Sequence, residues 1–359
     1  MTEVVDLARQ LIAIPSHRDE TAAGDAIERW LREHTDADVR RDDAGNVLAR
    51  RGSGDDTLAL VGHHDVVPPA EDQVDGDGTP TTAIRDGRLY GRGSADMKGA
   101  VAAMLLAFRD AEPAGELALA SFVGEEVGGV GARHAVDDGF VPDRAVVGEG
   151  SAAYATPGAL DVVVAHRGRR GSTVVAEGVA CHASTPEAGE NAIYRAIEAI
   201  ERLRSLEPPT ATVAGDRLDG SLEATRIEAG TADNVVPERC EVTLDERTVP
   251  GGHLDLEAAL ADLGGVHRRI DQDWPPMECS DDAFASTVRR TLTETQGVGI
   301  SAVTKPHATD ASWLARAGTA TVVVGPAERG EAHTADESVS IELLEAAQAG
   351  YRAVAEAPR

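Results

Sequence analysis

Hydrophobic positions in the first part of the chain follow helical spacing before they follow strand spacing. Apolar residues recur every three or four positions over 4–11 and again over 21–34, which predicts two amphipathic helices. The first pattern stops before Pro15. Residues 46–50 and 57–62 instead alternate or run apolar, as strands do.

Several later apolar runs end in residues that can bind metals or protons. The run 57–62 leads into GHHDVVP, the run 116–124 leads into two glutamates, and 143–148 leads into Glu149. A fourth run, 320–325, precedes a loop that carries His333. Strands that present such residues at their carboxyl ends indicate an open α/β sheet whose ligand site lies outside those ends.

The pattern changes in the middle of the chain. The expected order there is β-α-β-β-α-β, which is the split ferredoxin-like arrangement. Its strands are expected at 171–177, 222–229, 240–248 and 266–271, and its helices at 191–206 and 254–263. We therefore expect a small domain at 171–275, inserted between two parts of a larger domain at 1–170 and 276–359.

The stretch LYGRGSADMKG at 89–99 reads as a strand end, a tight loop and a helix start. Asp96 then lies at the helix entrance, where an acidic residue can simply cap unpaired N–H groups. The alternative is that Asp96 is one carboxylate shared by two metal ions. The other fragments of the sequence favour this second interpretation.

His63 and Asp65 lie two apart, so on an extended chain they share a face, and His64 points the other way. A carboxylate beside an imidazole is the usual partner of a metal-binding histidine. Glu125 and Glu126 end an apolar strand, where two acids are costly to bury without a cation. One could bind a metal while its neighbour accepts a proton; the alternative is a solvated loop.

The expected insert contributes its own polar candidates. His182 lies in a loop of small residues, CHASTPEAGENAI, where a histidine can also face solvent. Arg247, at a strand end, and the run Arg169 to Ser172 could bind a carboxylate through paired hydrogen bonds. The alternative for these arginines is salt bridging within an acidic protein.

Charge narrows the choice of partners. With 34 basic and 62 acidic residues the net charge is -28, which argues against nucleic acid and anionic membranes. Lys98 and Lys305 are the only lysines, and aromatic residues make up 3%. Such surfaces stay hydrated where salt screens their repulsion, so we expect a salt-adapted, halophilic protein. Its melting temperature should rise with KCl concentration; equal stability in dilute buffer would contradict this.

Cysteine usage and the start of the chain favour a cytoplasmic protein. Cys181, Cys240 and Cys279 are odd in number and irregularly spaced, which fits a reducing compartment. The first residues show neither a basic head nor an apolar run long enough for a signal peptide or a membrane span.

Taken together, the fragments resemble a known family. GHHDVVP, LYGRGSADMKG, GEEVGG, VGEG, CHASTPEAGENAI and AHTADESV are similar, in order and spacing, to dinuclear zinc hydrolases. These include succinyl-diaminopimelate desuccinylase, acetylornithine deacetylase, aminoacylase and carboxypeptidase G. The resemblance spans nearly the whole chain. It implies a mixed-sheet zinc-peptidase catalytic domain with an inserted ferredoxin-like α+β domain for lid closure and dimerisation.

The resemblance implies two Zn²⁺ ions, which Co²⁺ or Mn²⁺ can replace. It places His63 and Glu149 on one ion, Glu126 and His333 on the other, and Asp96 between them. Two protein ligands plus a shared carboxylate leave room for water on each ion. It also implies a cis peptide bond after Asp96.

Catalytic roles follow from the same resemblance. Asp65 would orient His63, and Glu125 would be the general base that passes a proton from water to the leaving amine. His182 would stabilise the oxyanion from the insert of a partner subunit, which implies a homodimer.

Substrate contacts are also implied, at Arg169, Ser172, Asn234 and Arg247. The run HRGRRGS at 166–172 resembles succinyl-diaminopimelate desuccinylase, an enzyme of lysine biosynthesis that hydrolyses N-succinyl-LL-2,6-diaminopimelate. Thr185 departs from that enzyme, and ATDASW and EAHTADESV look more like deacetylases and carboxypeptidases. The alternatives are an N-acetylornithine or N-acyl amino acid deacetylase or a carboxypeptidase of the same family, a monomeric dipeptidase, and an inactive binding homologue.

Overall fold

The computed structural model describes residues 2–358 as two compact units. The first comprises Met1–Ala165, Met277–Lys305 and Thr309–Arg359, and the second comprises His166–Pro276 with Pro306–Ala308. The second unit begins before residue 171, where the sequence analysis placed the boundary, because its first strand starts at Gly168. The lid and dimerisation roles expected of this insert stay predictions.

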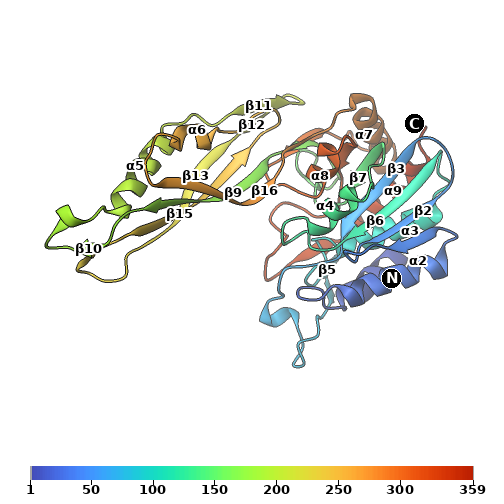
Figure 1. The fold of residues 1–359 in the computed structure, drawn as a ribbon. Helices are drawn as coiled ribbons and strands as arrows, with labels where there is room; N and C mark the ends of the chain where they lie inside the picture. The colour runs from blue at the N-terminus through green and yellow to red at the C-terminus, as the bar shows by residue number, and fades with distance from the viewer. Residues whose placement is uncertain (1, 359) are drawn as a thin grey trace. The chain divides into compact units, whose positions relative to one another are not determined.

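The first unit alternates strands with helices (Figure 1). Its helices are α1 (Glu3–Ile12), α2 (Thr21–His34), α3 (Lys98–Asp110), α4 (Val130–Asp137), α7 (Asp282–Gln296), α8 (Ala311–Arg316) and α9 (Ile341–Glu356). Its strands are β1 (Asp38–Arg41), β2 (Val47–Arg51), β3 (Thr57–His63), β4 (Ala83–Arg85), β5 (Arg88–Tyr90), β6 (Glu116–Phe122), β7 (Arg144–Val147), β8 (Val162–His166), β17 (Met277–Glu278), β18 (Ala302–Lys305), β19 (Ala320–Val323) and β20 (Ser338–Ser340).

A mixed sheet organises this unit, as the sequence predicted. Among residues 2–358 it has nine strands, in the order β1-β2-β6-β3-β7-β19-β8-β17, with β18 paired to β8. Strands β6, β3, β7 and β19 run parallel to one another. Strand β1 pairs antiparallel with β2, β2 with β6, and β8 with β19. The carboxyl ends of the four parallel strands therefore meet at one edge of the sheet.

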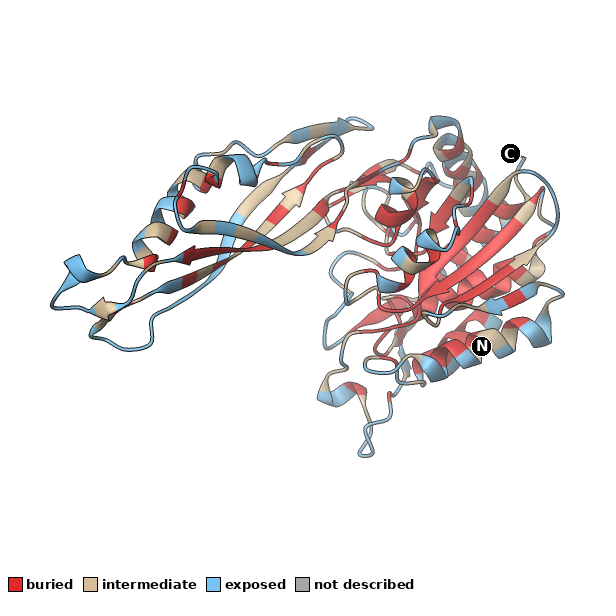
Figure 2. Cartoon of the chain, in the orientation of Figure 1, coloured by how far each residue is buried: buried red, intermediate tan, exposed pale blue. Residues whose placement is uncertain are grey.

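Helix α3 lies at the centre of the hydrophobic core. It packs against β3 and β6, while α1 and α9 pack on α3 itself. Residues 98–108 are consequently all buried, rather than only the apolar stripe that the spacing predicted. Figure 2 shows the same burial in the central strands. The loop before α3, which carries Asp96, is thus anchored to the most buried helix of the unit.

The second unit confirms the expected ferredoxin-like arrangement. Its main elements are β9 (Gly168–Glu177), α5 (Ala192–Arg204), β13 (Ser221–Ala229), β15 (Arg239–Thr248), α6 (Leu256–Leu260) and β16 (Val266–Trp274). The sheet order β13-β15-β9-β16 is antiparallel throughout. The unit also has two small two-stranded sheets. One pairs β10 (Cys181–His182) with β14 (Val235–Val236), and the other pairs β11 (Thr210–Val213) with β12 (Asp216–Asp219).

Helix α5 covers one face of this small sheet. Ala192, Ala196, Ala199 and Leu203 recur at helical spacing, and all are buried against strand residues such as Val242. The side chain of Asn191 accepts the N–H of Ile193 and so caps the start of the helix.

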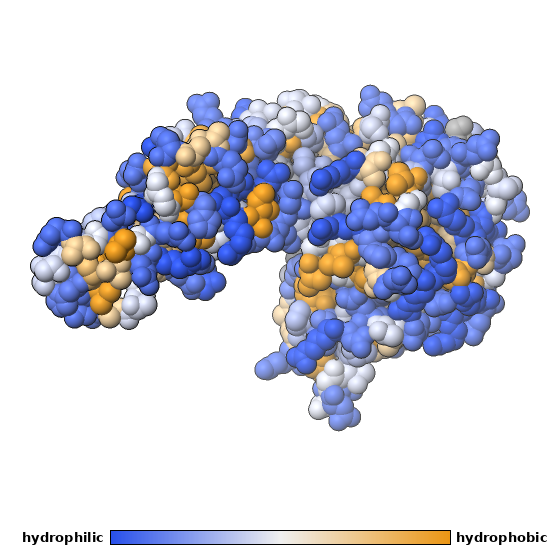
Figure 3. Space-filling model, viewed as in Figure 1, coloured by the Kyte–Doolittle hydropathy of each residue, from blue (hydrophilic) through white to orange (hydrophobic). Residues whose placement is uncertain are grey.

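The surface is largely polar. On the face drawn in Figure 3, hydrophilic side chains predominate over both units. None of the helices within residues 2–358 is both long enough and apolar enough to cross a bilayer.

Candidate metal centre

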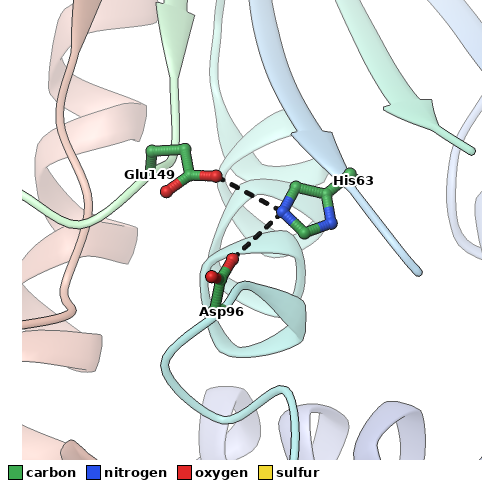
Figure 4. A group of neighbouring side chains, drawn as sticks. All are labelled: His63, Asp96 and Glu149. Atoms are coloured by element: carbon green, nitrogen blue, oxygen red, sulfur yellow. Dashed lines mark hydrogen bonds and ion pairs between the residues drawn. The ribbon is translucent and has the colours of Figure 1, made fainter. Parts of the chain in front are cut away.

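The first group of candidate ligands gathers at the ends of β3 and β7. His63 ends β3 and Glu149 follows β7 by two residues, while Asp96 comes from the loop before α3. His63 Nε2 lies 3.1 Å from Asp96 Oδ1 and 3.3 Å from Glu149 Oε1. Figure 4 shows these three side chains pointing toward one another.

The second group shares Asp96 with the first. His333 Nε2 lies 3.1 Å from Asp96 Oδ2 and 2.9 Å from Glu126 Oε1. The two oxygens of Asp96 are thus divided between His63 and His333. Within residues 2–358, the ligand atoms of each group lie within 4.8 Å of one another. The Asp96–Met97 peptide bond is cis, as the resemblance implies.

These separations fit a divalent cation. Ligands about 2.0–2.1 Å from a tetrahedral ion such as zinc lie about 3.3 Å apart, close to the observed contacts. Imidazole and carboxylate are also the donor types that zinc accepts. The residues present therefore suit one ion in each group, with Asp96 between them.

Asp65 ties the first histidine to the neighbouring glutamates. Its Oδ1 lies 3.2 Å from His63 Nδ1 and accepts the N–H of Glu125 at 3.1 Å. Its Oδ2 accepts the N–H of Glu126 at 3.0 Å. This buried carboxylate fixes the ring of His63 and the turn after β6 together.

His64 points away from the group, as expected. Its Nδ1 lies 2.9 Å from the hydroxyl of Ser121, and burial lowers its pKa to about 3. It is therefore a neutral histidine at physiological pH and packs inside the unit.

The acidic neighbours of His63 and His333 raise the pKa of both side chains, so both hold a proton that a metal ion would replace. Hydrogen bonds to Asp96 and Glu126 raise the pKa of His333 to about 10. Burial lowers the pKa of His63, but Asp65, Asp96 and Glu149 outweigh burial and raise it well above its usual range. Because a histidine ligand must be neutral, metal binding here must displace protons.

Glu125, the expected general base, lies in a buried and acidic environment. Burial raises its pKa well above the usual range; the charges of Asp310 and Glu149 add to the shift, while His63 opposes it. A raised pKa is typical of carboxyl groups that exchange protons in catalysis, which supports the expected role of Glu125; that role stays a prediction.

Lys305, which no sequence motif singled out, contacts this group of candidate ligands. Its Nζ lies 3.2 Å from Glu149 Oε2, so the two oxygens of Glu149 face Lys305 and His63 separately. Burial lowers the pKa of Lys305, but the charge of Glu149 outweighs it, and the ammonium stays charged. The other lysine, Lys98, is also buried and donates to the carbonyls of Leu11 and Ile14.

Asp310 was also missed. It is buried, and neither carboxylate oxygen has a hydrogen-bond partner among the described residues. Burial raises its pKa well above the usual range, and the nearby charges of Asp65, Glu149 and Glu126 add to the shift. The only signal was its place in ATDASW, a fragment of the family resemblance.

The other expected functional residues lie in the second unit, where His182 and Asn234 are neighbours. The pairing of β10 with β14 brings them together, and Asn234 Nδ2 lies 3.4 Å from His182 Nε2. His182 Nδ1 lies 2.7 Å from the hydroxyl of Ser184. His182 is exposed, so its Nε2 can meet a ligand.

The expected carboxylate-binding arginines already have acidic partners. Arg169 Nε and Arg247 Nε donate to the two oxygens of Asp245, at 2.7 and 2.6 Å. Ser172 is fully buried, and its hydroxyl accepts from Arg268 Nε at 3.0 Å. Their roles in substrate binding stay predictions, and a bound carboxylate would compete with Asp245.

Comparison with known proteins identifies the family. Residues 59–357 match the model of peptidase family M20/M25/M40. Succinyl-diaminopimelate desuccinylase of Stenotrophomonas maltophilia is 33% identical over 99% of each chain.

Solved structures share the fold. A metallo-carboxypeptidase from Sulfolobus solfataricus superposes with a TM-score of 0.78 at 15% identity, covering 99% of both chains. A dinuclear metal binding peptidase from Bacillus subtilis gives 0.70 at 17% identity, covering 98% of this chain and 96% of that one. The chain therefore belongs to peptidase family M20/M25/M40 and is a metal-dependent hydrolase of that family.

Proposed function

We propose that the protein uses two zinc ions to hydrolyse N-succinyl-LL-2,6-diaminopimelate to succinate and diaminopimelate. The observation that carries this proposal is Asp96, whose two oxygens face His63 and His333 separately. The similarity to desuccinylases over the full chain supports the choice of substrate.

The ligand groups, Glu125 and Asp65 would have separate roles in the reaction. Two ions held by the ligand groups would polarise the amide carbonyl and acidify a water molecule. Glu125 would take a proton from that water as its oxygen adds to the carbonyl carbon. Glu125 would then return the proton to the amide nitrogen as the C–N bond breaks. Asp65 would keep the ring of His63 in place throughout.

His182 would donate a hydrogen bond to the oxyanion that forms on the carbonyl oxygen. By the family resemblance, it would serve the site of a partner subunit, so we propose a homodimer that joins through the insert. Exposed apolar residues of the second unit support such an interface: Tyr194 and Ile197 on α5, and Ile227 on the edge strand β13.

We also propose a cytoplasmic location. All three cysteines are free within the described structure, which supports a reducing compartment.

A hydrolysis panel tests the substrate. The zinc-loaded protein, assayed at low and high KCl, is offered N-succinyl-LL-2,6-diaminopimelate, N-acetylornithine, N-acyl amino acids and dipeptides. We expect kcat/KM for the succinyl substrate to exceed the others by at least about a hundredfold, because buried polar groups reject analogues that leave them unpaired.

Other results of this panel would change the assigned substrate or activity. A preference for N-acetylornithine or another N-acyl amino acid would assign a deacylase, in keeping with ATDASW and EAHTADESV. Comparable rates on every compound would remove the substrate assignment. No hydrolysis by a protein that holds two ions would favour an inactive binding homologue.

A further inference from the structure

Glu337 joins the loop of Asp96 to the loop of His333. It is buried, and its Oε1 accepts three backbone N–H groups of one turn: those of Gly93, Ala95 and Asp96, at 2.9, 3.0 and 3.1 Å. Its Oε2 pairs with the guanidinium of Arg92. The carboxylate therefore fills an anion-binding turn made by the segment that carries the shared aspartate.

The loop that carries His333 is exposed up to Glu337. Residues 332–336 are exposed, and Glu337 is the first buried residue after them. His333 itself has φ of 66°, in the left-handed region that histidine rarely adopts. Such a conformation persists only where the surrounding structure holds it.

Other contacts also join the same two segments. Strand β20, which starts directly after Glu337, pairs with β5, which ends before the Asp96 loop. Gly91 donates its N–H to the carbonyl of Glu337 at 3.1 Å. The side chain of Glu337 is the contact that reaches the backbone N–H of Asp96 itself.

We propose that Glu337 is a positioning residue that holds Asp96 and His333 at the separation needed for two cations to share Asp96. The inference rests on the proposed metal centre. Among the described residues, the oxygens of Glu337 contact none of the ligand atoms themselves. Glu337 acts through the backbone N–H of Asp96 and through its place four residues after His333. Residues that hydrogen-bond to metal ligands and orient them typically contribute a factor of about 10–100 to metal affinity.

Glu337→Gln tests the proposal. The amide oxygen can still accept the N–H groups, but the amide NH₂ would face the buried guanidinium of Arg92 and leave it without an acceptor. The matched control is Glu328→Gln, since Glu328 lies on the same loop and pairs with Arg88. Metal-free proteins are titrated with Zn²⁺ and Co²⁺ by calorimetry, and turnover is measured against metal concentration.

We expect the unmodified protein and Glu328→Gln to bind two ions alike. Glu337→Gln should bind at least one ion about ten- to a hundredfold more weakly, and excess metal should restore its turnover. If Glu337→Gln does not fold, Glu337→Asp, which keeps the charge but shortens the side chain, is titrated instead and should show the same direction of change.

Two results would overturn the proposal in different ways. A folded Glu337→Gln protein that binds both ions like the unmodified protein would show that Glu337 only stabilises the fold. An unmodified protein that binds no transition metal would overturn the metal centre and this role together.

Discussion

Replacing Glu125 by glutamine should lower kcat by a factor of about 10²–10⁴, the usual contribution of a general base, while both ions stay bound. Glutamine keeps the size of the side chain, and the backbone N–H of residue 125 can still donate to Asp65. It cannot take a proton from water. Steady-state rates and the metal content of the dialysed protein measure the two effects.

The matched control is Glu71→Gln, at an exposed glutamate of the same unit. It should retain the rate and the metal content of the unmodified protein. Full activity in Glu125→Gln would refute the assignment of the base, whereas loss of metal would mean that Glu125 is a ligand.

Asp96→Ala should release both ions and bring turnover below detection. Each ligand group would lose one of its three protein ligands, and the remaining pairs, His63 with Glu149 and Glu126 with His333, would be left unconnected. Asp55→Ala, at an exposed aspartate, is the control and should keep two ions. Metal analysis after dialysis decides the outcome.

A variant of a ligand that belongs to only one group should affect the two ions unequally. His333→Ala should weaken the ion of its own group more than the ion beside His63. If Asp96→Ala still holds two ions per chain, Asp96 is not shared, and the dinuclear arrangement is wrong.

Much of the fold could be predicted because its long elements carry strong periodicity. The helix expected at 21–34 and the strands expected from 57 and 116 lie where the structure has them. Helix α4 and strands β1 and β4 were not predicted, and only the end of β5 was. These elements are short, and their pairing depends on neighbours distant in the chain, which apolar spacing does not report.

The candidate ligands were accessible from the sequence because each follows a strand end or a recognisable motif. Lys305, Asp310 and Glu337 were not. Lys305 meets Glu149 across 156 positions, and Glu337 meets Asp96 across 241. Asp310 lies in ATDASW and Glu337 in EAHTADESV, but only the tertiary structure reveals which groups lie beside these three residues.

Two arginines of the insert have partners that the sequence offered only as an alternative. Arg169 and Arg247 were expected on a substrate carboxylate, yet both hold Asp245. Arg247 and Asp245 lie two apart on β15, so strand alternation alone places them on one face. Both arginines therefore form salt bridges within the insert, and their binding of a substrate carboxylate stays a prediction.

The burial of Lys98 and Lys305, 1% and 6% exposed, removes both side-chain amines of the chain from solvent. Acylating reagents and lysine-directed cross-linkers would thus find no lysine to modify on the intact fold. A protease that cleaves after lysine would be similarly excluded until the first unit opens. Modification of lysine would therefore measure the opening of this unit.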